Sequence, residues 1–97
     1  MMNTIENPNV SIEYLNELEP LIKENKAKPK DYEILDNYLS FLGVENFILN
    51  KLKDNRINSY QEFIHLRKTK SDSAINTLVG VVFGVISTLK KYISGKL

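Results

Sequence analysis

Residues 73–89 read Ser-Ala-Ile-Asn-Thr-Leu-Val-Gly-Val-Val-Phe-Gly-Val-Ile-Ser-Thr-Leu, seventeen positions without a charged side chain. No other part of the 97-residue chain is as apolar over such a length. Its large apolar residues recur at spacings of three and four, which predicts a helix with a broad apolar stripe. These residues are Ile75, Leu78, Val79, Val82, Val85, Ile86 and Leu89. The stripe is typical of the core helix of a small bundle.

Small residues form a second face of the same helix. Gly80 and Gly84 make a G-x-x-x-G pair, the spacing that lets two helix backbones approach closely. Each glycine costs a helix interior about 1 kcal/mol relative to alanine, so two of them suggest a packing reason. We therefore predict an interface with another chain, formed by Thr77, Gly80, Val81, Gly84 and Ser87.

Two other interpretations of residues 73–89 stay open. As a transmembrane helix, the run would extend roughly 25 Å, short of the roughly 30 Å hydrocarbon core. Basic residues also flank both of its ends, whereas topology signals favour one side. A strand is the other alternative, because the run is rich in β-branched residues and glycine can mark a bulge.

The composition is that of one soluble domain. The hydrophobic fraction is 42% and the charged fraction 26%, both ordinary for a globular chain. The absence of cysteine excludes a disulfide framework and a thiolate metal site. The first eight residues lack the apolar segment of a signal peptide. We expect a cytoplasmic protein or one within a macromolecular assembly, with membrane association as the alternative.

The net charge is +1, but the two halves of the chain differ. Residues 1–50 carry four basic and nine acidic side chains, a balance of −5, while residues 51–97 carry nine basic and three acidic, a balance of +6. Such asymmetry favours contact between the halves, or an anionic partner for the second. The candidate anion-binding residues are Lys51, Lys53, Arg56, Arg67, Lys68 and Lys70.

The whole pattern predicts an all-α fold, a small bundle of four to five short helices with a long apolar C-terminal helix. A polar arm over residues 1–10 precedes a single helical domain over residues 11–97. We expect breaks near Pro20, Gly43, residues 55–58 and residues 69–71, because proline, glycine and polar clusters interrupt helices there.

Local signals set the expected helix ends. Pro29 suits the first turn of the second helix, and the third is expected over residues 44–54. Ser59 and Glu62 form a capping box, in which Glu62 reaches back to the amide of the capping residue. Ser71 or Ser73 is expected to cap the last helix, and Gly95 to end it.

One stretch carries a family resemblance. Tyr-Leu-Ser-Phe-Leu-Gly-Val-Glu-Asn-Phe at 38–47, followed by Ile-Asn-Ser at 57–59, loosely resembles the opening of a sterile alpha motif domain. The resemblance covers roughly a quarter of the chain, and residues 68–73 replace the later Leu-Gly-Ile turn of that family. It implies a self-associating interaction module, the class that the glycine pair also favours.

Residues that carry chemistry are few. His65 is the only histidine, and a lone histidine is more often structural than catalytic or metal-binding. Pairs of carboxylates can do acid–base work. We interpret six carboxylates on the first two helices as parts of solvated helix faces: Glu13, Glu17, Glu24, Asp31, Glu33 and Asp36. We predict no enzyme activity, no metal and no cofactor.

The predicted function is that of a non-enzymatic protein–protein interaction or assembly protein. It would self-associate through the C-terminal helix, as a homo-oligomer or as a component of a larger complex. Abundant Asn, Lys and Ile are typical of an AT-rich genome, such as those of many bacteria and phages. The alternatives are a small membrane-associated protein anchored by that helix and, less favoured, a basic nucleic-acid-binding accessory protein.

Overall fold

The computed structural model describes residues 10–70 and 72–95, which form five α-helices and no strand. The all-α prediction and the long apolar C-terminal helix are confirmed, and the strand alternative for residues 73–89 is wrong. Residues 1–9 of the predicted polar arm lie outside the described part of the chain. The helices are α1 (Ile12–Lys23), α2 (Pro29–Phe41), α3 (Phe47–Asp54), α4 (Tyr60–Thr69) and α5 (Ser73–Ser94).

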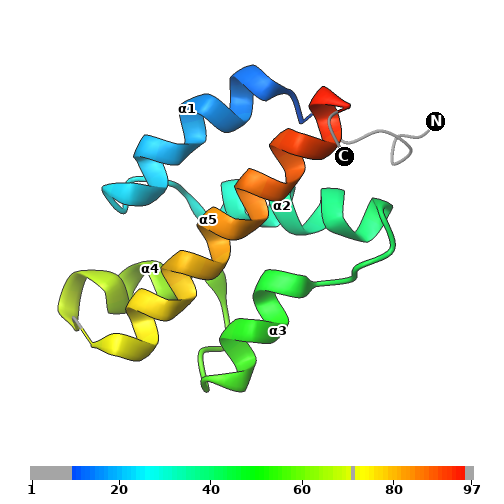
Figure 1. Cartoon of the computed structure of the whole chain (residues 1–97). Coiled ribbons are helices and arrows are strands. Elements are labelled where there is room, and N and C mark those ends of the chain that lie inside the picture. The colour runs from blue at the N-terminus through cyan, green and yellow to red at the C-terminus, as the bar shows by residue number, and fades with distance from the viewer. Residues whose placement is uncertain (1–9, 71, 96–97) are drawn as a thin grey trace.

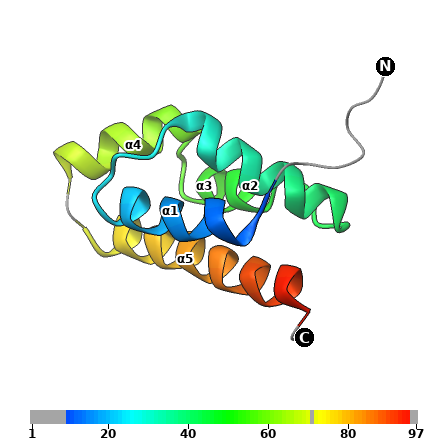
Figure 2. The ribbon, with the colours of Figure 1, turned by 90° about the horizontal axis from the view of Figure 1, so that it is seen from above.

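The helix α5 runs along one side of the bundle, and the other helices pack behind it (Figure 1). The view from above shows α1 directly over α5 and antiparallel to it, with α2, α3 and α4 forming the far layer (Figure 2). Helix α5 contacts α1, α3 and α4, while α2 packs on α3 and α4. One side of α5 is therefore covered, and the opposite side faces solvent.

The apolar stripe of α5 is the centre of the core. Six of its seven predicted members are buried and Val79 is half-buried. On the far side of the core, Tyr32 stacks on Tyr60 with ring centroids 6.0 Å apart and meets the edge of Phe63 at 5.8 Å. Buried apolar area is the main favourable contribution to folding, so α5 holds the bundle together through this one face.

Helix α1 does not break at Pro20, contrary to the sequence prediction. It continues to Lys23, with Pro20 exposed inside its last turn. The proline has no amide donor, so it cannot donate to the carbonyl four residues earlier. It lies in the last turn, so this single loss does not end the helix. The carbonyl of Pro20 still accepts from the amide of Glu24 at 3.0 Å. The predicted N-cap is confirmed, since Ser11 Oγ accepts from the amide of Tyr14 at 3.1 Å.

Gly43 ends α2 as predicted, in the left-handed conformation with φ +98°. The amide of Gly43 donates to the Ser40 carbonyl at 3.0 Å and that of Val44 to the Leu39 carbonyl at 2.8 Å, a Schellman motif. The next helix begins at Phe47, three residues later than predicted. Asn46 adopts φ +50° immediately before it, so residues 44–46 form a turn rather than a helix start.

Ser59 caps α4 as predicted, its hydroxyl accepting from the Glu62 amide at 3.0 Å. The second half of the capping box differs, because Glu62 accepts from the amide of Asn58, one residue before the cap. The predicted cap of α5 is wrong. Asp72 caps it, with Oδ1 accepting from the Ile75 amide at 2.9 Å, and its carboxylate also suits the positive end of the helix.

Asp36 is buried, with 2% of its surface exposed, so its interpretation as a solvated carboxylate is wrong. Its two oxygens accept from the amides of Ile48 at 2.8 Å and Leu49 at 3.0 Å, and from the hydroxyl of Tyr60 at 2.6 Å. Burial, and then the hydrogen bond to Asp36, raises the pKa of Tyr60 above its ordinary value. One carboxylate on α2 thus caps α3 and fixes α4. We call it the Asp36 junction.

Candidate protein-docking surface on the C-terminal helix

The small residues of α5 face solvent. Ser73, Thr77, Gly80, Gly84 and Ser87 are all exposed, and we call them the outer face. A β-carbon built on Gly80 or Gly84 would meet no heavy atom within 4 Å. Packing among the described helices therefore gives no reason for either glycine. The G-x-x-x-G pair is available to another chain.

The outer face carries no charge over its whole length. The charged residues that bound it are Asp72, which is occupied as the N-cap, and Lys90 and Lys91, of which Lys91 is exposed one turn beyond Ser87. Lys90 Nζ lies 2.7 Å from Glu19 Oε1 on α1 and is turned away from the outer face. A solvent-facing helix side normally carries charged residues, and their depletion marks the core of a protein–protein interface.

An apolar groove of about 420 Å³ runs beside the outer face. Helix α5 forms one wall with Val81, Gly84, Val85 and Thr88. The other wall is formed by Leu39 of α2, Val44 of the following turn and Phe47 of α3. Val81, a predicted interface residue, is half-buried in this wall, and Gly84 belongs to both surfaces.

Three exposed large apolar residues belong to the groove or to the helices that form it. Val44 is 45% exposed, and Phe41, on the last turn of α2, is 55% exposed. Tyr92 is 45% exposed and lies one helical turn beyond Thr88. Tyr38 links α2 to α5. Its ring stacks on that of Phe41 with centroids 6.1 Å apart and meets the ring of Tyr92 edge-on with centroids 6.5 Å apart. Exposed large apolar residues that are grouped, rather than scattered singly, favour a binding site.

The sequence located only the α5 half of this surface. The groove residues Leu39, Val44 and Phe47 were absent from the predicted interface. Leu39 and Phe47 match core positions of their own helices, so their spacing gave no sign of a surface role. Val44 was the one available signal, because it follows Gly43 outside the apolar stripe of either neighbouring helix.

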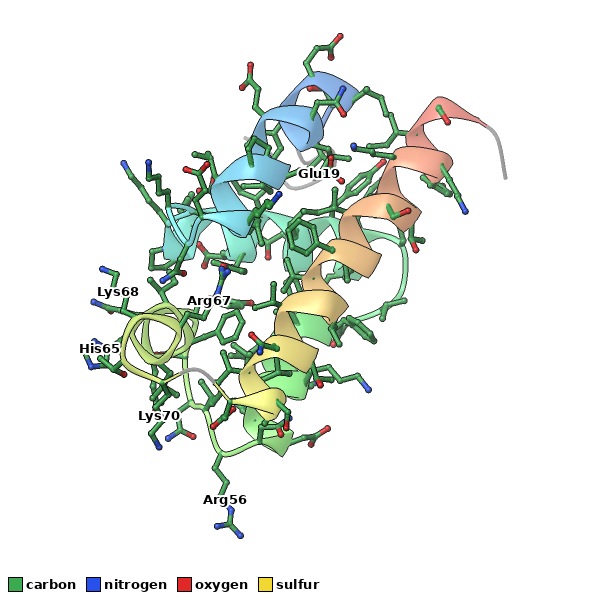
Figure 3. All side chains as sticks on the ribbon, turned by 60° about the vertical axis from the view of Figure 1, so that its left-hand side comes forward. Glu19, Arg56, His65, Arg67, Lys68 and Lys70 are labelled. Atoms are coloured by element: carbon green, nitrogen blue, oxygen red, sulfur yellow. The ribbon has the colours of Figure 1, made fainter. Side chains whose placement is uncertain are left out.

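The six predicted anion-binding residues do not form one patch. Lys51 lies 5.5 Å above the ring of Phe47, and Lys53 is exposed on the same helix. Arg56 and Lys70 line one pocket, and Lys68 lines a different one. Arg67 is engaged within the chain, as its guanidinium donates to the Ile22 carbonyl at 2.6 Å, and to the Lys23 carbonyl and Asn25 Oδ1 at 3.3 Å each. Figure 3 shows Arg67 pointing toward α1, and Lys68, Lys70 and Arg56 pointing outward apart from one another.

The structure also places the residues that were considered for acid–base or metal chemistry. Within residues 10–70 and 72–95, three or more His, Cys, Asp or Glu residues nowhere come together as potential metal ligands. His65 is exposed on α4. Asp36 and Asp31 are occupied by structural hydrogen bonds; Asp31 accepts from the Tyr14 hydroxyl at 2.8 Å and the Lys28 amide at 2.9 Å.

Helix α5 meets the length and composition of a membrane span. Its 22 residues correspond to roughly 33 Å of helix, and a window of 18 residues within it has a mean hydropathy of 1.5. The uncharged run 73–89 accounts for only about 25 Å of this length, and the helix continues past Lys90 and Lys91 to Ser94, where Gly95 ends it as predicted. This is weak evidence for a span, since the core helix of a soluble bundle meets the same criteria.

No known protein family, curated protein or solved structure matches this chain. The resemblance of residues 38–59 to a sterile alpha motif domain stays an observation on the sequence. The function must therefore be argued from the surfaces themselves.

Proposed function

We propose that this protein is a non-enzymatic assembly protein that self-associates through the outer face of α5 and the apolar groove beside it. The observation that carries the proposal is the pair of exposed glycines, Gly80 and Gly84, on a helix side without charge. Two glycines in a helix interior lower its stability by about 1 kcal/mol each. Packing among the described helices does not offset that loss, whereas close approach of a second helix would.

The neighbouring groove supports a partner that is itself a helix. A helix with small residues leaves room for the second backbone, and Val81, Val85 and Phe47 supply apolar area at its edge. Exposed Phe41 and Tyr92 extend that area, and aromatic residues are enriched at interfaces. The contact then combines close backbone approach with apolar burial.

The chemistry of the outer face fits a second copy of the same face. It is uncharged, so two copies meet without like-charge repulsion, and hydroxyl groups of Ser73, Thr77 and Ser87 can hydrogen-bond across the contact. Most soluble oligomers are symmetric dimers built from one self-complementary patch. A two-fold contact of α5 with α5 is the simplest arrangement that uses these features, within a homo-oligomer or a larger assembly.

Analytical ultracentrifugation of the purified protein tests the proposal. We expect a mass above that of the 11.2 kDa monomer. Thr77→Lys places a charge in the outer face and should shift the protein to monomer while its circular dichroism is unchanged. Asn16→Lys places the same charge on an exposed position of α1 and should leave the mass unaltered. A monomeric wild type, or equal effects of the two variants, would refute self-association through this face.

Membrane anchoring by α5 is the second candidate, favoured by the length and hydropathy of that helix. Spanning would require α5 to leave α1, α3 and α4, which together bury six of its side chains. Sedimentation with phospholipid vesicles separates the two candidates. Anchoring predicts that the protein pellets with the vesicles and is released by detergent, whereas self-association predicts a mass that does not depend on lipid.

A further inference from the structure

A basic pocket lies on another face of the molecule, between the α1–α2 connection and α4. Its volume is about 650 Å³, within the range of small-molecule sites. The connection and the start of α2 contribute residues 25–29, and α4 contributes Gln61, Ile64, His65 and Lys68 from one helical face. Lys28 was not among the predicted anion-binding residues, because it is distant from Lys68 in the sequence.

The side chains that line this pocket carry positive charge, although the Asp31 carboxylate accepts from the Lys28 amide at 2.9 Å. Lys26, Lys28 and Lys68 line it, and none of its nine lining residues, all within the described chain, is acidic. Lys26 has one carboxylate neighbour, Glu24 at 3.2 Å, but both side chains are more than half exposed, and such pairs are weak. In Figure 3, Lys68 and His65 project from the outer side of α4, whereas Lys70 and Arg56 lie lower on the molecule.

The walls of the pocket are held in place before any ligand arrives. Asn25, at φ +57°, donates from Nδ2 to the Ile64 carbonyl at 3.0 Å and accepts from Arg67 at 3.3 Å. The amides of Lys26 and Ala27 both donate to the Leu21 carbonyl, at 2.7 and 3.2 Å. These bonds tie the connection to α1 and α4. A site that needs no ordering on binding gains affinity.

The pocket also has an apolar part. Ala27 is 4% exposed, and Pro29 and Ile64 lie beside it among the lining residues. Lysines around an apolar floor match a ligand that joins an anionic group to an apolar body. Phosphate is the anion that lysine binds as a point charge, and Gln61 and Asn25 add polar groups.

We propose that the pocket between the α1–α2 connection and α4 binds a phosphate ester with an organic body that has apolar surface, held by Lys28 and Lys68 over Ala27 and Pro29. This site is separate from the proposed assembly surface, and neither depends on the other. The same chemistry can come from a free nucleotide or from a nucleotide unit of a single-stranded nucleic acid, so the test includes both sources.

Isothermal titration calorimetry at low ionic strength tests the site with three probes: inorganic phosphate, adenosine 5′-monophosphate and a single-stranded oligonucleotide. We expect the monophosphate to bind roughly tenfold more tightly than phosphate, because only the ester contacts the apolar floor. Tighter oligonucleotide binding that displaces the monophosphate would identify nucleic acid as the source. Binding of the monophosphate alone would identify the free ester. Absence of monophosphate binding, or equal affinity for inorganic phosphate, would overturn the proposal.

Matched variants locate the binding. Lys28→Gln and Lys68→Gln should each weaken monophosphate binding about tenfold, through loss of one charge-assisted hydrogen bond. Lys53→Gln removes the same charge from an exposed position on α3 outside the pocket, and should change the affinity less than about twofold. Equal losses in all three would mean diffuse attraction to a basic surface and would refute the site. Unchanged thermal melts would show that the variants are folded.

Discussion

The Asp36 junction and the outer face of α5 both contain residues that are unfavourable at their positions, but only those at the junction have partners within the described chain. At the junction, a residue that is unfavourable in a core is explained by the chain itself, since three donors meet the two oxygens of Asp36. On the outer face, Gly80 and Gly84 are unfavourable in a helix and nothing in the described chain touches their open side. The difference separates residues selected by folding from residues selected by something outside the fold.

The largest effect is expected at the junction. Asp36→Ala leaves two helix-end amides and the Tyr60 hydroxyl without their acceptor in a buried site, and should lower the free energy of unfolding by roughly 3 kcal/mol. Asp54→Ala removes an exposed carboxylate from α3 and should change it by less than about 0.5 kcal/mol. Urea denaturation of both variants measures the difference. Similar midpoints would contradict the structural role of Asp36.

The second largest effect on the free energy of unfolding is expected at Arg67. Arg67→Ala removes donors to two carbonyls at the end of α1 and to Asn25, and we expect a loss of about 2 kcal/mol. Its neighbour Lys68 is exposed, so Lys68→Ala should cost less than about 0.5 kcal/mol. The same denaturation experiment compares the two. Equal losses would show that Arg67 acts as a surface charge, as the sequence pattern implied.

Patterns within one helix predicted the fold well. The stripe of α5, the left-handed glycine at Gly43 and the cap at Ser59 all depend on residues within about four positions of one another, and all three are confirmed. The interpretation of Asp36 as a solvated carboxylate was wrong because its hydrogen-bond partners lie 12, 13 and 24 positions away in the sequence. A signal was present nonetheless, since Asp36 shares the apolar face of Tyr32, Leu35 and Leu39.

The candidate site was predicted only in part, for the same reason. A groove depends on two walls, and a sequence pattern describes one helix at a time. The outer face of α5 was therefore predictable, while the wall formed by Val44 and Phe47 was not. The predicted anion-binding set shows the converse limit. It grouped residues by sequence, whereas the fold brings Lys68 to Lys28 and turns Arg67 toward the end of α1.

A smaller effect distinguishes the true cap of α5 from the predicted one. Asp72→Ala removes the acceptor for the Ile75 amide and should cost about 1 kcal/mol. Ser73→Ala replaces an exposed residue in the first turn with a stronger helix former and should be neutral or slightly stabilising. In thermal melts, only Asp72→Ala should therefore lower the melting temperature. A larger loss for Ser73→Ala would restore the serine cap that the sequence predicted.

The smallest effect on the stability of the monomer, and the one with opposite sign, is expected on the outer face. Gly80→Leu and Gly84→Leu place side chains where each added β-carbon has open space. Leucine is the better helix former, so each change should raise monomer stability by somewhat less than about 1 kcal/mol. Gly43→Leu is the matched control: its added β-carbon also has open space, but φ is +98°, and the strain should lower stability by about 1 kcal/mol.

The association state of the same variants then decides what the outer face is for. If a second α5 lies against Gly80 and Gly84, leucine at either position blocks the close approach, and both variants should sediment as stable monomers. Denaturation must be compared at equal protein concentration, because association raises the apparent stability of the wild type. Leucine variants that keep the wild-type mass would show that the glycines contact no partner. The two glycines would then destabilise α5 without allowing any close contact. The difference between the outer face and the Asp36 junction would not indicate an interface.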